Sequence, residues 1–289
     1  MTDALNPRTN PTLTAEVLTQ ALPYIQRFGG ATVVVKFGGN AMVDPKLSQT
    51  FAADIVLMHS VGIKPVVVHG GGPQIGAMLE QIGKQSEFVE GLRVTDAETL
   101  DVARMVLGGK VSRDIVSAIN VHGPLAVGVS GEDAGLIRAT PRSPELGFVG
   151  DVDSVNPDII HRLLAENMIP VVSSIGSDET GQAYNINADT VAGHLAAAVG
   201  AHKLIVLTDV DGMRRDPEDP ASLIQQITAG ELHPLVGTPT VSGGMIPKVE
   251  ACLTAVDNGV ASAHMINGTI EHVLLLELFT DSGIGTMIR

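Results

Sequence analysis

The sequence predicts an α/β fold in which helices cover both faces of an open, mainly parallel β-sheet. Short β-branched runs such as 33–35 and 66–68 recur along the chain, and stretches with the period of a helix lie between them. The runs are apolar along most of their length, as in a sheet that is buried on both faces. Such alternation is typical of parallel strands joined by crossover helices.

The individual elements follow from these patterns in chain order. Residues 13–28 carry apolar side chains at spacings of three and four, which predicts an amphipathic helix that Pro23 bends or breaks near its middle. From residue 31 onward, β-branched runs that end in Gly, Ser, Asp or Asn predict strands. The expected strands are 31–37, 64–70, 125–130, 169–176, 202–209 and 261–268, and the expected helices are 46–60, 73–82, 96–121, 158–167, 188–200 and 245–258.

Two further segments, 146–155 and 181–187, have the pattern of hairpins and predict antiparallel pieces at one edge of the sheet. No internal repeat or long linker interrupts the chain. We therefore expect a helical N-terminal region 1–28, followed by two lobes, 29–180 and 181–289, that share one continuous sheet.

Composition limits the kind of function. With 289 residues and 44% hydrophobic side chains the chain can bury a sizeable core, and its formal charge of −14 argues against a nucleic-acid partner. Any phosphate chemistry should therefore be confined to a pocket. The sequence has no membrane-length apolar run and no signal-peptide layout at its start, and its single cysteine, Cys252, excludes an internal disulfide. A cytoplasmic location is expected.

Two of the predicted strands end in glycine turns. Gly38 and Gly39 come shortly after Lys36, and three glycines at 70–72 follow His69. Glycine turns that lead into a helix can present several N–H groups to an anion. A tight strand-to-helix turn without a ligand is the alternative for either one. The Walker A pattern is absent, so a nucleotide would be bound by another scheme.

Two lysines are placed unusually for structural residues. Lys36 ends an apolar strand, where burial costs desolvation energy, and Lys248 lies in the first turns of a helix that begins near Met245, where the dipole disfavours a cation. Anionic partners would explain both positions, and phosphoryl transfer needs such charges. The alternatives are a strand-end lysine that reaches solvent and a solvated surface lysine.

Polar side chains that could hold a substrate lie near both lysines. Asn187 or Asp189 could cap the helix 188–200, and the same segment contains Asn185, which is more than one cap requires. Arg93 precedes a helix that Thr95 is expected to cap, and its guanidinium suits a carboxylate. A surface salt bridge is the alternative for Arg93.

The sequence motifs give little support to a protein-bound metal site or to hydrolase activity. The segment 205–213 ends in Asp209, Asp211 and Gly212, which could hold Mg²⁺, although it does not match a calcium-loop pattern. We interpret it as a turn on the nucleotide side. The nine histidines form no zinc motif, and there is no G-x-S-x-G nucleophile elbow.

Seven segments, in order and spanning almost the whole chain, together resemble the amino-acid kinase family. The resemblance implies a three-layer αβα sandwich around a mainly parallel eight-stranded sheet. It also implies that ATP binds over the C-terminal lobe. The acceptor, N-acetyl-L-glutamate, would bind over the N-terminal lobe and be phosphorylated as a step in arginine biosynthesis. The segments are "VVVKFGGNAM", "VVVHGGGPQIG", "GLRVTDAETLDVARMVLGGKV", "PVVSSIG", "YNINADTVA", "LTDVDGM" and "SGGMIPKV".

The same resemblance implies a role for each site residue. Lys36 and Lys248 match the two lysines that stabilise the transferring phosphoryl group, and Asp189 matches the aspartate that organises them. Mg²⁺ is held mainly by the phosphates, so no protein metal ligand is expected. Acetylglutamate-binding positions match Gly71, Gly72, Arg93 and Asn185, with Arg93 on the α-carboxylate, and nucleotide-binding positions match Gly38, Gly39, Thr208, Asp209 and Gly212.

The N-terminal helix extends the resemblance to the hexameric, arginine-inhibited members of the family. In these, N-terminal helices interlace between the dimers of a trimer of dimers. Inhibition by L-arginine is therefore expected, with Glu277 on the cationic end of the inhibitor. The positions that match this regulatory region are Tyr24, Arg27, His264, Glu277 and Gly283.

Two alternative functions remain. A kinase of the same family with another acceptor, such as glutamate, aspartate, carbamate, UMP or an acetylaminoadipate-type substrate, would share the lysines and the glycine turns. A non-catalytic arginine-sensing module is the other alternative. The presence of Lys36, Asp189 and Lys248 argues against that module, and Arg93 and Asn185 favour acetylglutamate.

Overall fold

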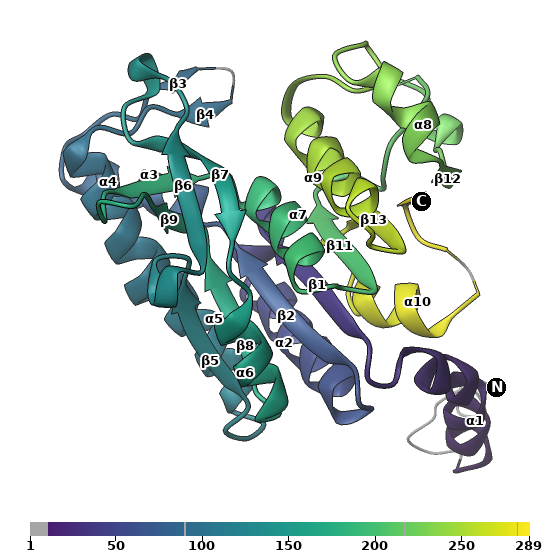
Figure 1. The fold of residues 1–289 in the computed structure, drawn as a ribbon. Helices are drawn as coiled ribbons and strands as arrows, with labels where there is room; N and C mark the ends of the chain where they lie inside the picture. The colour runs from purple at the N-terminus through teal and green to yellow at the C-terminus, as the bar shows by residue number, and fades with distance from the viewer. Residues whose placement is uncertain (1–10, 90, 217, 282) are drawn as a thin grey trace.

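The computed structural model describes residues 11–289 except 90, 217 and 282. In this part of the chain the central sheet has eight strands, and β13–β14 is the one antiparallel pair in it (Figure 1). The mainly parallel sheet expected from the sequence is confirmed. Its strands in spatial order are β12 (Gln226–Ile227), β14 (Thr286–Ile288), β13 (Ser262–Asn267), β11 (Lys203–Thr208), β1 (Thr32–Phe37), β2 (Lys64–His69), β8 (Ile169–Ser173) and β5 (Ala126–Ser130).

Helices cover both faces of this sheet. Alternate residues of β1 enter two separate cores, Val33 and Val35 on one face and Val34 on the other. This is the three-layer arrangement implied by the family resemblance. The first core is covered by α2 (Pro45–Ser60), α3 (Gly72–Gln81), α4 (Ala97–Arg104), η3 (Met105–Val111), α5 (Ser112–Asn120) and α10 (Val273–Phe279), and the second by α6 (Asp158–Ala165), α7 (Ala188–Ala198) and α9 (Ile246–Asp257).

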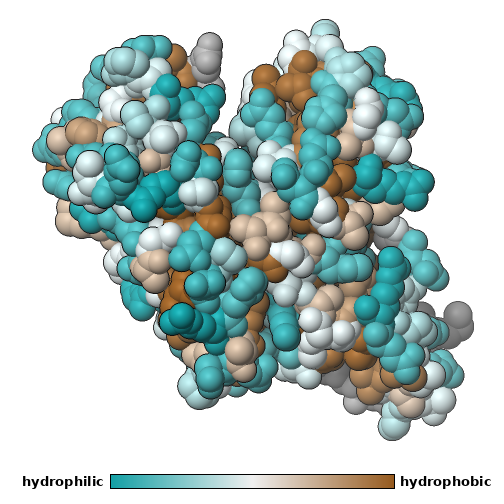
Figure 2. Space-filling model, viewed as in Figure 1, coloured by the Kyte–Doolittle hydropathy of each residue, from teal (hydrophilic) through white to brown (hydrophobic). Residues whose placement is uncertain are grey.

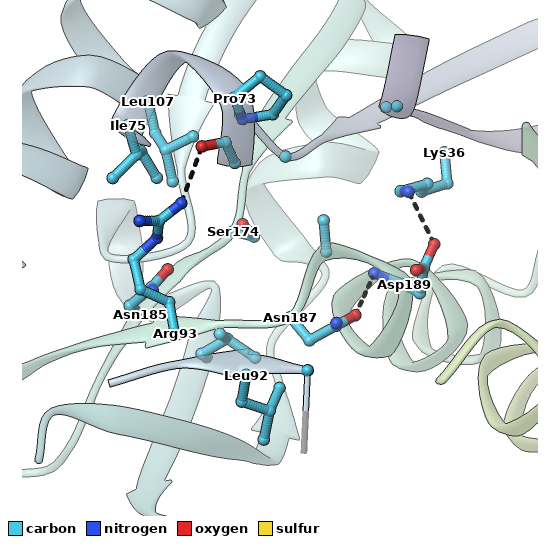
Figure 3. A pocket seen from close by; sticks show the side chains of 18 of the residues that line it. Lys36, Pro73, Ile75, Leu92, Arg93, Leu107, Ser174, Asn185, Asn187 and Asp189 are labelled. Carbon is cyan, nitrogen blue, oxygen red and sulfur yellow. Dashed lines mark hydrogen bonds and ion pairs between the residues drawn. The ribbon is translucent and has the colours of Figure 1, made fainter. Parts of the chain in front are cut away.

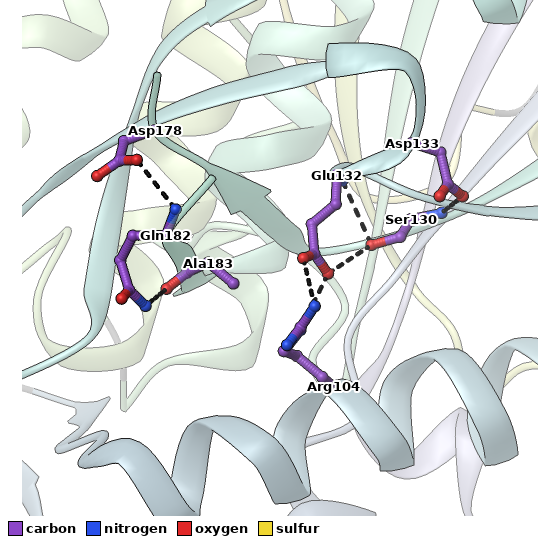
Figure 4. A network of polar contacts seen from close by, with 7 residues as sticks. All are labelled: Arg104, Ser130, Glu132, Asp133, Asp178, Gln182 and Ala183. Carbon is purple, nitrogen blue, oxygen red and sulfur yellow. Dashed lines mark hydrogen bonds and ion pairs between the residues drawn. The ribbon is translucent and has the colours of Figure 1, made fainter. Parts of the chain in front are cut away.

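The expected α-helix 96–121 is interrupted by a π-helix. Residues 105–111 (η3) form the π-helix. The α-helices α4 and α5 flank it directly on either side. Arg104, the last residue of α4, forms an ion pair with Glu132 after β5, 2.7 Å from Nη2 to Oε1 (Figure 4). Ser130 Oγ also lies within 3.5 Å of Glu132. These contacts tie the start of the π-helix to the sheet.

Neither segment expected to be a hairpin forms one by itself, but the antiparallel pairing expected there is confirmed. Segment 146–155 contains one strand, β7 (Val149–Val155), and segment 181–187 contains one, β10 (Ala183–Ile186). With β6 (Ile137–Pro141) and β9 (Ile175–Ser177) they close a small barrel beside the central sheet. In this barrel β7 pairs antiparallel with β6, and β10 with β9. Gly150 lies inside β7 rather than in a turn. Tyr184 packs so closely on it that a Cβ at this position would lie 2.6 Å from the Cβ of Tyr184, which explains the glycine.

The N-terminal helix α1 (Pro11–Phe28) runs on through Pro23, so the break expected there does not occur. Proline deprives the Thr19 carbonyl of its helical partner, but Thr19 is exposed and water can satisfy that oxygen. The helix contacts α10, and Tyr24 donates a hydrogen bond of 2.6 Å to Asp281 Oδ1. Residues 1–10 of the expected N-terminal region lie outside the described residues.

The surface of the view in Figure 2 is divided by a notch between the barrel region and the part that carries α8 (Ala229–Leu232) and α9. Hydrophilic side chains line much of its rim. No helix among the described residues combines the length and the apolar character needed to cross a membrane.

Candidate active site

Both glycine turns lie at one end of the central sheet. Strands β1 and β2 are parallel neighbours, with Phe37 opposite His69 in their register. The turns that follow these residues therefore open at the same edge, as expected from the sequence. Together they border a cavity of about 290 Å³, which we call the first cavity (Figure 3). Its lining includes Lys36, Gly38, Gly39, Gly71, Gly72, Arg93, Asn185 and Asp189.

A cluster of opposite charges lies at one end of the first cavity. Lys36 Nζ is 2.9 Å from Asp189 Oδ1, and Lys248 Nζ is 3.5 Å from Asp189 Oδ2. Lys36 and Asp189 are almost fully buried, whereas Lys248 is partly exposed. Burial would raise the pKa of Asp189, but the charges of Lys36 and then Lys248 outweigh burial and hold it below its ordinary value. Two ammonium groups thus share one carboxylate, which leaves a net positive charge.

The ends of two helices place Asp189 and Lys248. Asn187 caps α7 by accepting hydrogen bonds from the N–H groups of Asp189 and Thr190, so it fills the cap role that the sequence left open between Asn187 and Asp189. Lys248 is the third residue of α9, as predicted, and also donates to the Gly244 carbonyl at 3.2 Å. The two helices pack closely at Gly193, where a Cβ would lie 2.6 Å from the Ala251 carbonyl oxygen.

Arg93 lies at the opposite end of the first cavity. Its Nη2 donates a 2.9 Å hydrogen bond to the Gly72 carbonyl, its Nη1 bonds Ser86, and its guanidinium lies 4.7 Å from the centre of the Phe88 ring. Burial lowers the pKa of Arg93. An oriented, partly desolvated guanidinium suits a carboxylate ligand.

Asn185 lies beside Arg93 and donates to Thr95 Oγ1 at 3.3 Å. The cap expected from Thr95 is wrong, because Asp96 is the N-cap of α4 and accepts from the Thr99 N–H. The backbone of Thr95 is instead bonded to Leu146 and Phe148 near the barrel.

The predicted nucleotide residues lie around the C-terminal end of β11. Thr208 is its last residue, and Asp209 approaches the glycine turn so closely that a Cβ on Gly39 would lie 2.8 Å from its Oδ1. Gly39 also has a positive φ of 69°, which favours glycine. Gly212 lines a separate hollow of about 180 Å³ that also contains Arg214 and Met245.

The comparisons with known proteins agree with this geometry. Residues 31–267 match the pattern of the amino acid kinase family. The chain belongs to that family. It is 55% identical to the acetylglutamate kinase of Saccharopolyspora erythraea, over 95% of this chain and 92% of that protein, and 54% identical to that of Nostoc sp., over 94% and 92%. This amino acid kinase is therefore an enzyme that transfers a phosphoryl group.

Solved structures share the fold of this kinase. The N-acetylglutamate synthase of Neisseria gonorrhoeae, complexed with coenzyme A and N-acetyl-glutamate, superposes with a TM-score of 0.82 at 26% identity. The match covers 95% of this chain and 63% of the synthase, so this kinase spans less than two thirds of that protein's length. Carbamate kinase from Giardia lamblia has a TM-score of 0.67 at 19% identity, over 90% of this chain and 98% of that one, and shows the fold alone.

A second cavity of the kinase, of about 660 Å³, lies between α1, α10 and the edge of the sheet. It brings together all five residues predicted for the regulatory region: Tyr24, Arg27, His264, Glu277 and Gly283. Glu277 Oε1 lies 2.9 Å from Lys203 Nζ and 2.7 Å from His264 Nδ1. Its carboxylate therefore already has partners in this structure.

Sequence reasoning missed several residues around these two cavities. Lys203 begins β11 and is buried, and a lysine within an apolar strand was the signal that could have identified it, as it did for Lys36. Leu107 enters the lining of the first cavity from the π-helix, which no sequence pattern indicated. His69 also escaped attention, although it is wholly buried next to the glycines.

Proposed function

We propose that this kinase transfers the γ-phosphoryl group of ATP to the γ-carboxylate of N-acetyl-L-glutamate, as a step in arginine biosynthesis in the cytoplasm. The observation that carries the proposal is the first cavity, which has Arg93 at one end and the lysine cluster of Lys36, Asp189 and Lys248 near the other. An amino-acid derivative with two carboxylates fits this polarity. The names of relatives that are 51–55% identical support the same acceptor.

In the proposed reaction an oxygen of the γ-carboxylate attacks the γ-phosphorus in line. The new O–P bond forms as the bond to the β–γ bridging oxygen breaks, and ADP leaves with that electron pair. The acceptor carboxylate is already ionised at pH 7, so no general base is needed. Lys36 and Lys248 would stabilise the charge on the transferring group, and Asp189 would hold both ammonium groups in place.

The α-carboxylate of the acceptor would lie on Arg93, its polar groups on Asn185, and its γ-carboxylate near the amides of Gly71 and Gly72. The turn at Gly38 and Gly39 would face the phosphates. Thr208, Asp209 and Gly212 would lie on the nucleotide side. No three acidic, histidine or cysteine side chains of the described residues gather into a metal site. As the family resemblance implies, a Mg²⁺ ion that accompanies ATP would be held mainly by the phosphates.

The proposal is tested by measuring ADP release with three acceptors: N-acetyl-L-glutamate, glutamate and acetylaminoadipate. We expect kcat/KM to be at least about tenfold higher for N-acetyl-L-glutamate, because glutamate lacks the acetyl group and acetylaminoadipate carries one additional methylene. Equal or greater turnover with either of the others would reject the proposed acceptor.

We further propose that L-arginine inhibits the enzyme by binding in the second cavity. The convergence of Tyr24, Arg27, His264, Glu277 and Gly283 on one cavity supports this site. The cationic end of arginine would compete with Lys203 for Glu277. Activity that is unchanged by millimolar arginine would rule out the regulatory part of the proposal without affecting the catalytic part.

A hexamer, built as a trimer of dimers through α1, completes the proposal. Helix α1 exposes an apolar stripe, with Val17 50%, Leu18 65% and Leu22 48% exposed, and such a stripe favours burial against another helix. Light scattering coupled to gel filtration should give the mass of six chains. A Leu18→Lys variant should reduce it to that of a dimer.

A further inference from the structure

His69 ends β2 immediately before the three glycines 70–72 and is 0% exposed. Its Nδ1 lies 2.9 Å from the Gly70 carbonyl oxygen. A carbonyl can only accept, so Nδ1 carries the hydrogen and donates it. The other ring nitrogen, Nε2, is buried and has no hydrogen-bond partner among the described residues. The bond to Gly70 is therefore the one that the ring makes in this part of the chain.

The imidazole does not act through charge. Burial lowers the pKa of His69 to about 4, so the ring is neutral at pH 7. His69 is also 0% exposed and is not among the residues that line the first cavity. A neutral, buried ring with a single hydrogen bond can therefore act by orienting the group to which it is bonded.

That hydrogen bond fixes one peptide plane of the glycine turn. In a trans peptide the C=O of Gly70 and the N–H of Gly71 point in opposite directions. Because the carbonyl is held toward the imidazole, the N–H of Gly71 points away from the imidazole. Gly71 itself lines the first cavity. Without the bond, glycine allows this plane to rotate at little cost.

The other two peptides of the turn are held by different partners. In the Gly71–Gly72 peptide, the Gly71 carbonyl accepts from the Ile75 N–H at 2.9 Å. The Gly72 carbonyl accepts from Arg93 Nη2 at 2.9 Å, while the N–H groups of Gly71 and Gly72 donate to no other backbone group outside helices and strands in the described chain. His69 and Arg93 thus hold the first and third peptides of the turn, Gly70–Gly71 and Gly72–Pro73, and the Ile75 N–H holds the one between them. This leaves the amides of Gly71 and Gly72 available to a ligand.

We infer that His69 is a positioning residue for the acceptor: its Nδ1–H orients the Gly70–Gly71 peptide so that the glycine amides meet the acceptor's carboxylate. This inference rests on the proposed function, since it concerns binding of N-acetyl-L-glutamate. It assigns His69 no contact with substrate or with the reacting atoms.

Three variants separate this role from simple packing. In His69→Asn, the amide nitrogen occupies the place of Nδ1 and can keep the bond to Gly70. In His69→Gln, the nitrogen is one bond further along, nearer the place of Nε2, and in His69→Leu there is no donor. We would measure kcat, the KM for N-acetyl-L-glutamate, the KM for ATP and the melting temperature of all three.

We expect the Asn variant to keep the KM for N-acetyl-L-glutamate within about threefold of the wild type. The Gln and Leu variants should raise it about tenfold, the loss expected for one hydrogen bond. The KM for ATP should change less than about twofold, because the phosphates are assigned to the other turn. If the Leu variant does not fold, the comparison of Asn with Gln remains.

Other outcomes would overturn the inference. They are an Asn variant that binds the acceptor as weakly as Gln does, equal acceptor KM values in all three variants, and parallel increases in both KM values. Wild-type turnover with N-acetyl-L-glutamate is measured first. Its absence would reject the proposed function together with this inference, whereas normal wild-type turnover with any of those outcomes would reject His69 alone.

Discussion

Two buried carboxylates of this kinase, Asp189 and Glu277, each contact two basic side chains, but the clusters differ in net charge. Asp189 has two lysines, which gives one surplus positive charge. Glu277 has Lys203 and His264, and burial lowers the pKa of His264, so the histidine is neutral at pH 7 and the cluster carries no net charge.

The difference shows what each cluster can bind. A surplus of positive charge beside a cavity attracts phosphate. The bound anion then offsets the free energy that was needed to desolvate that charge. The Glu277 cluster is already neutral, so a cationic ligand must displace a partner there. Burial would raise the pKa of Glu277, but the hydrogen bond from His264 and the charge of Lys203 keep it below its ordinary value. This difference supports the proposal that the first cluster acts in catalysis and the second in regulation.

The strongest test of this comparison removes one lysine from each cluster. Lys36→Met should keep the fold but lower kcat by about 10²–10³-fold, the usual cost of losing one group that stabilises transition-state charge. Lys203→Met should lower kcat far less. Lys64→Met, at the exposed start of β2, is the matched control. Steady-state kinetics and circular dichroism suffice, and near-normal kcat in Lys36→Met would refute the catalytic assignment.

A smaller loss of kcat is expected when the distance between α7 and α9, the helices that carry Asp189 and Lys248, is increased. In Gly193→Ala the new Cβ would lie 2.6 Å from the Ala251 carbonyl oxygen, so α7 and α9 must separate. Asp189 and Lys248 move with them, and kcat should fall about tenfold because small misplacements are costly in catalysis. Unfolding should become easier by about 1–3 kcal/mol.

The control for this experiment is Gly230→Ala in α8, where a Cβ meets nothing within 4 Å. Chemical denaturation and kinetics are measured for both variants. A Gly193→Ala enzyme that loses stability but keeps its kcat would show that the spacing of Asp189 and Lys248 tolerates this shift.

The second cluster is tested by Glu277→Gln. The variant loses the charge that would pair with the cationic end of arginine, so the concentration of arginine that halves activity should rise about tenfold or more. Activity is titrated with arginine at a fixed acceptor concentration. A titration curve that coincides with that of the wild type would move the regulatory site away from Glu277.

The fold and much of the first cavity could be predicted because they depend on local patterns. Strand and helix alternation indicated the sheet, and misplaced lysines indicated Lys36 and Lys248. The failures concern tertiary contacts. Thr95 can cap a helix in isolation, as Asp96 can, but it is buried and its backbone bonds segment 146–148. Gly150 resembles a turn residue until Tyr184 is packed on it.

Lys203 and His69 were missed for a related reason. A lysine within an apolar strand marks Lys203 as unusual and His69 is ordinary in its own segment, but the role of each depends on a partner that the fold supplies or orients. For Lys203 that partner is Glu277, 74 residues away. For His69 it is the carbonyl of the next residue, whose direction depends on the turn. Local patterns contain neither kind of information.

A third buried carboxylate sharpens the comparison by lacking a lysine. Asp54 on α2 is 2% exposed and accepts a 2.7 Å bond from His272 Nδ1, and burial raises its pKa to about 6. A carboxyl group whose folded pKa lies above its unfolded value stabilises the fold most at low pH and loses that contribution as the pH rises through about 6. Wild-type Asp54 is therefore a cost at pH 8.

Asp54→Asn removes this cost while an amide oxygen can still accept from His272. We expect the melting temperature at pH 8 to rise by about 2–4 °C, which corresponds to roughly 1 kcal/mol in a chain of this size. The gain should shrink on going to pH 5, where the wild-type carboxyl is largely protonated in the folded state. Asp114→Asn, at an exposed carboxylate, should show no such pH dependence. A gain that is equal at both pH values would mean that the effect is packing, and that Asp54 is no more costly to ionise than its two lysine-paired counterparts.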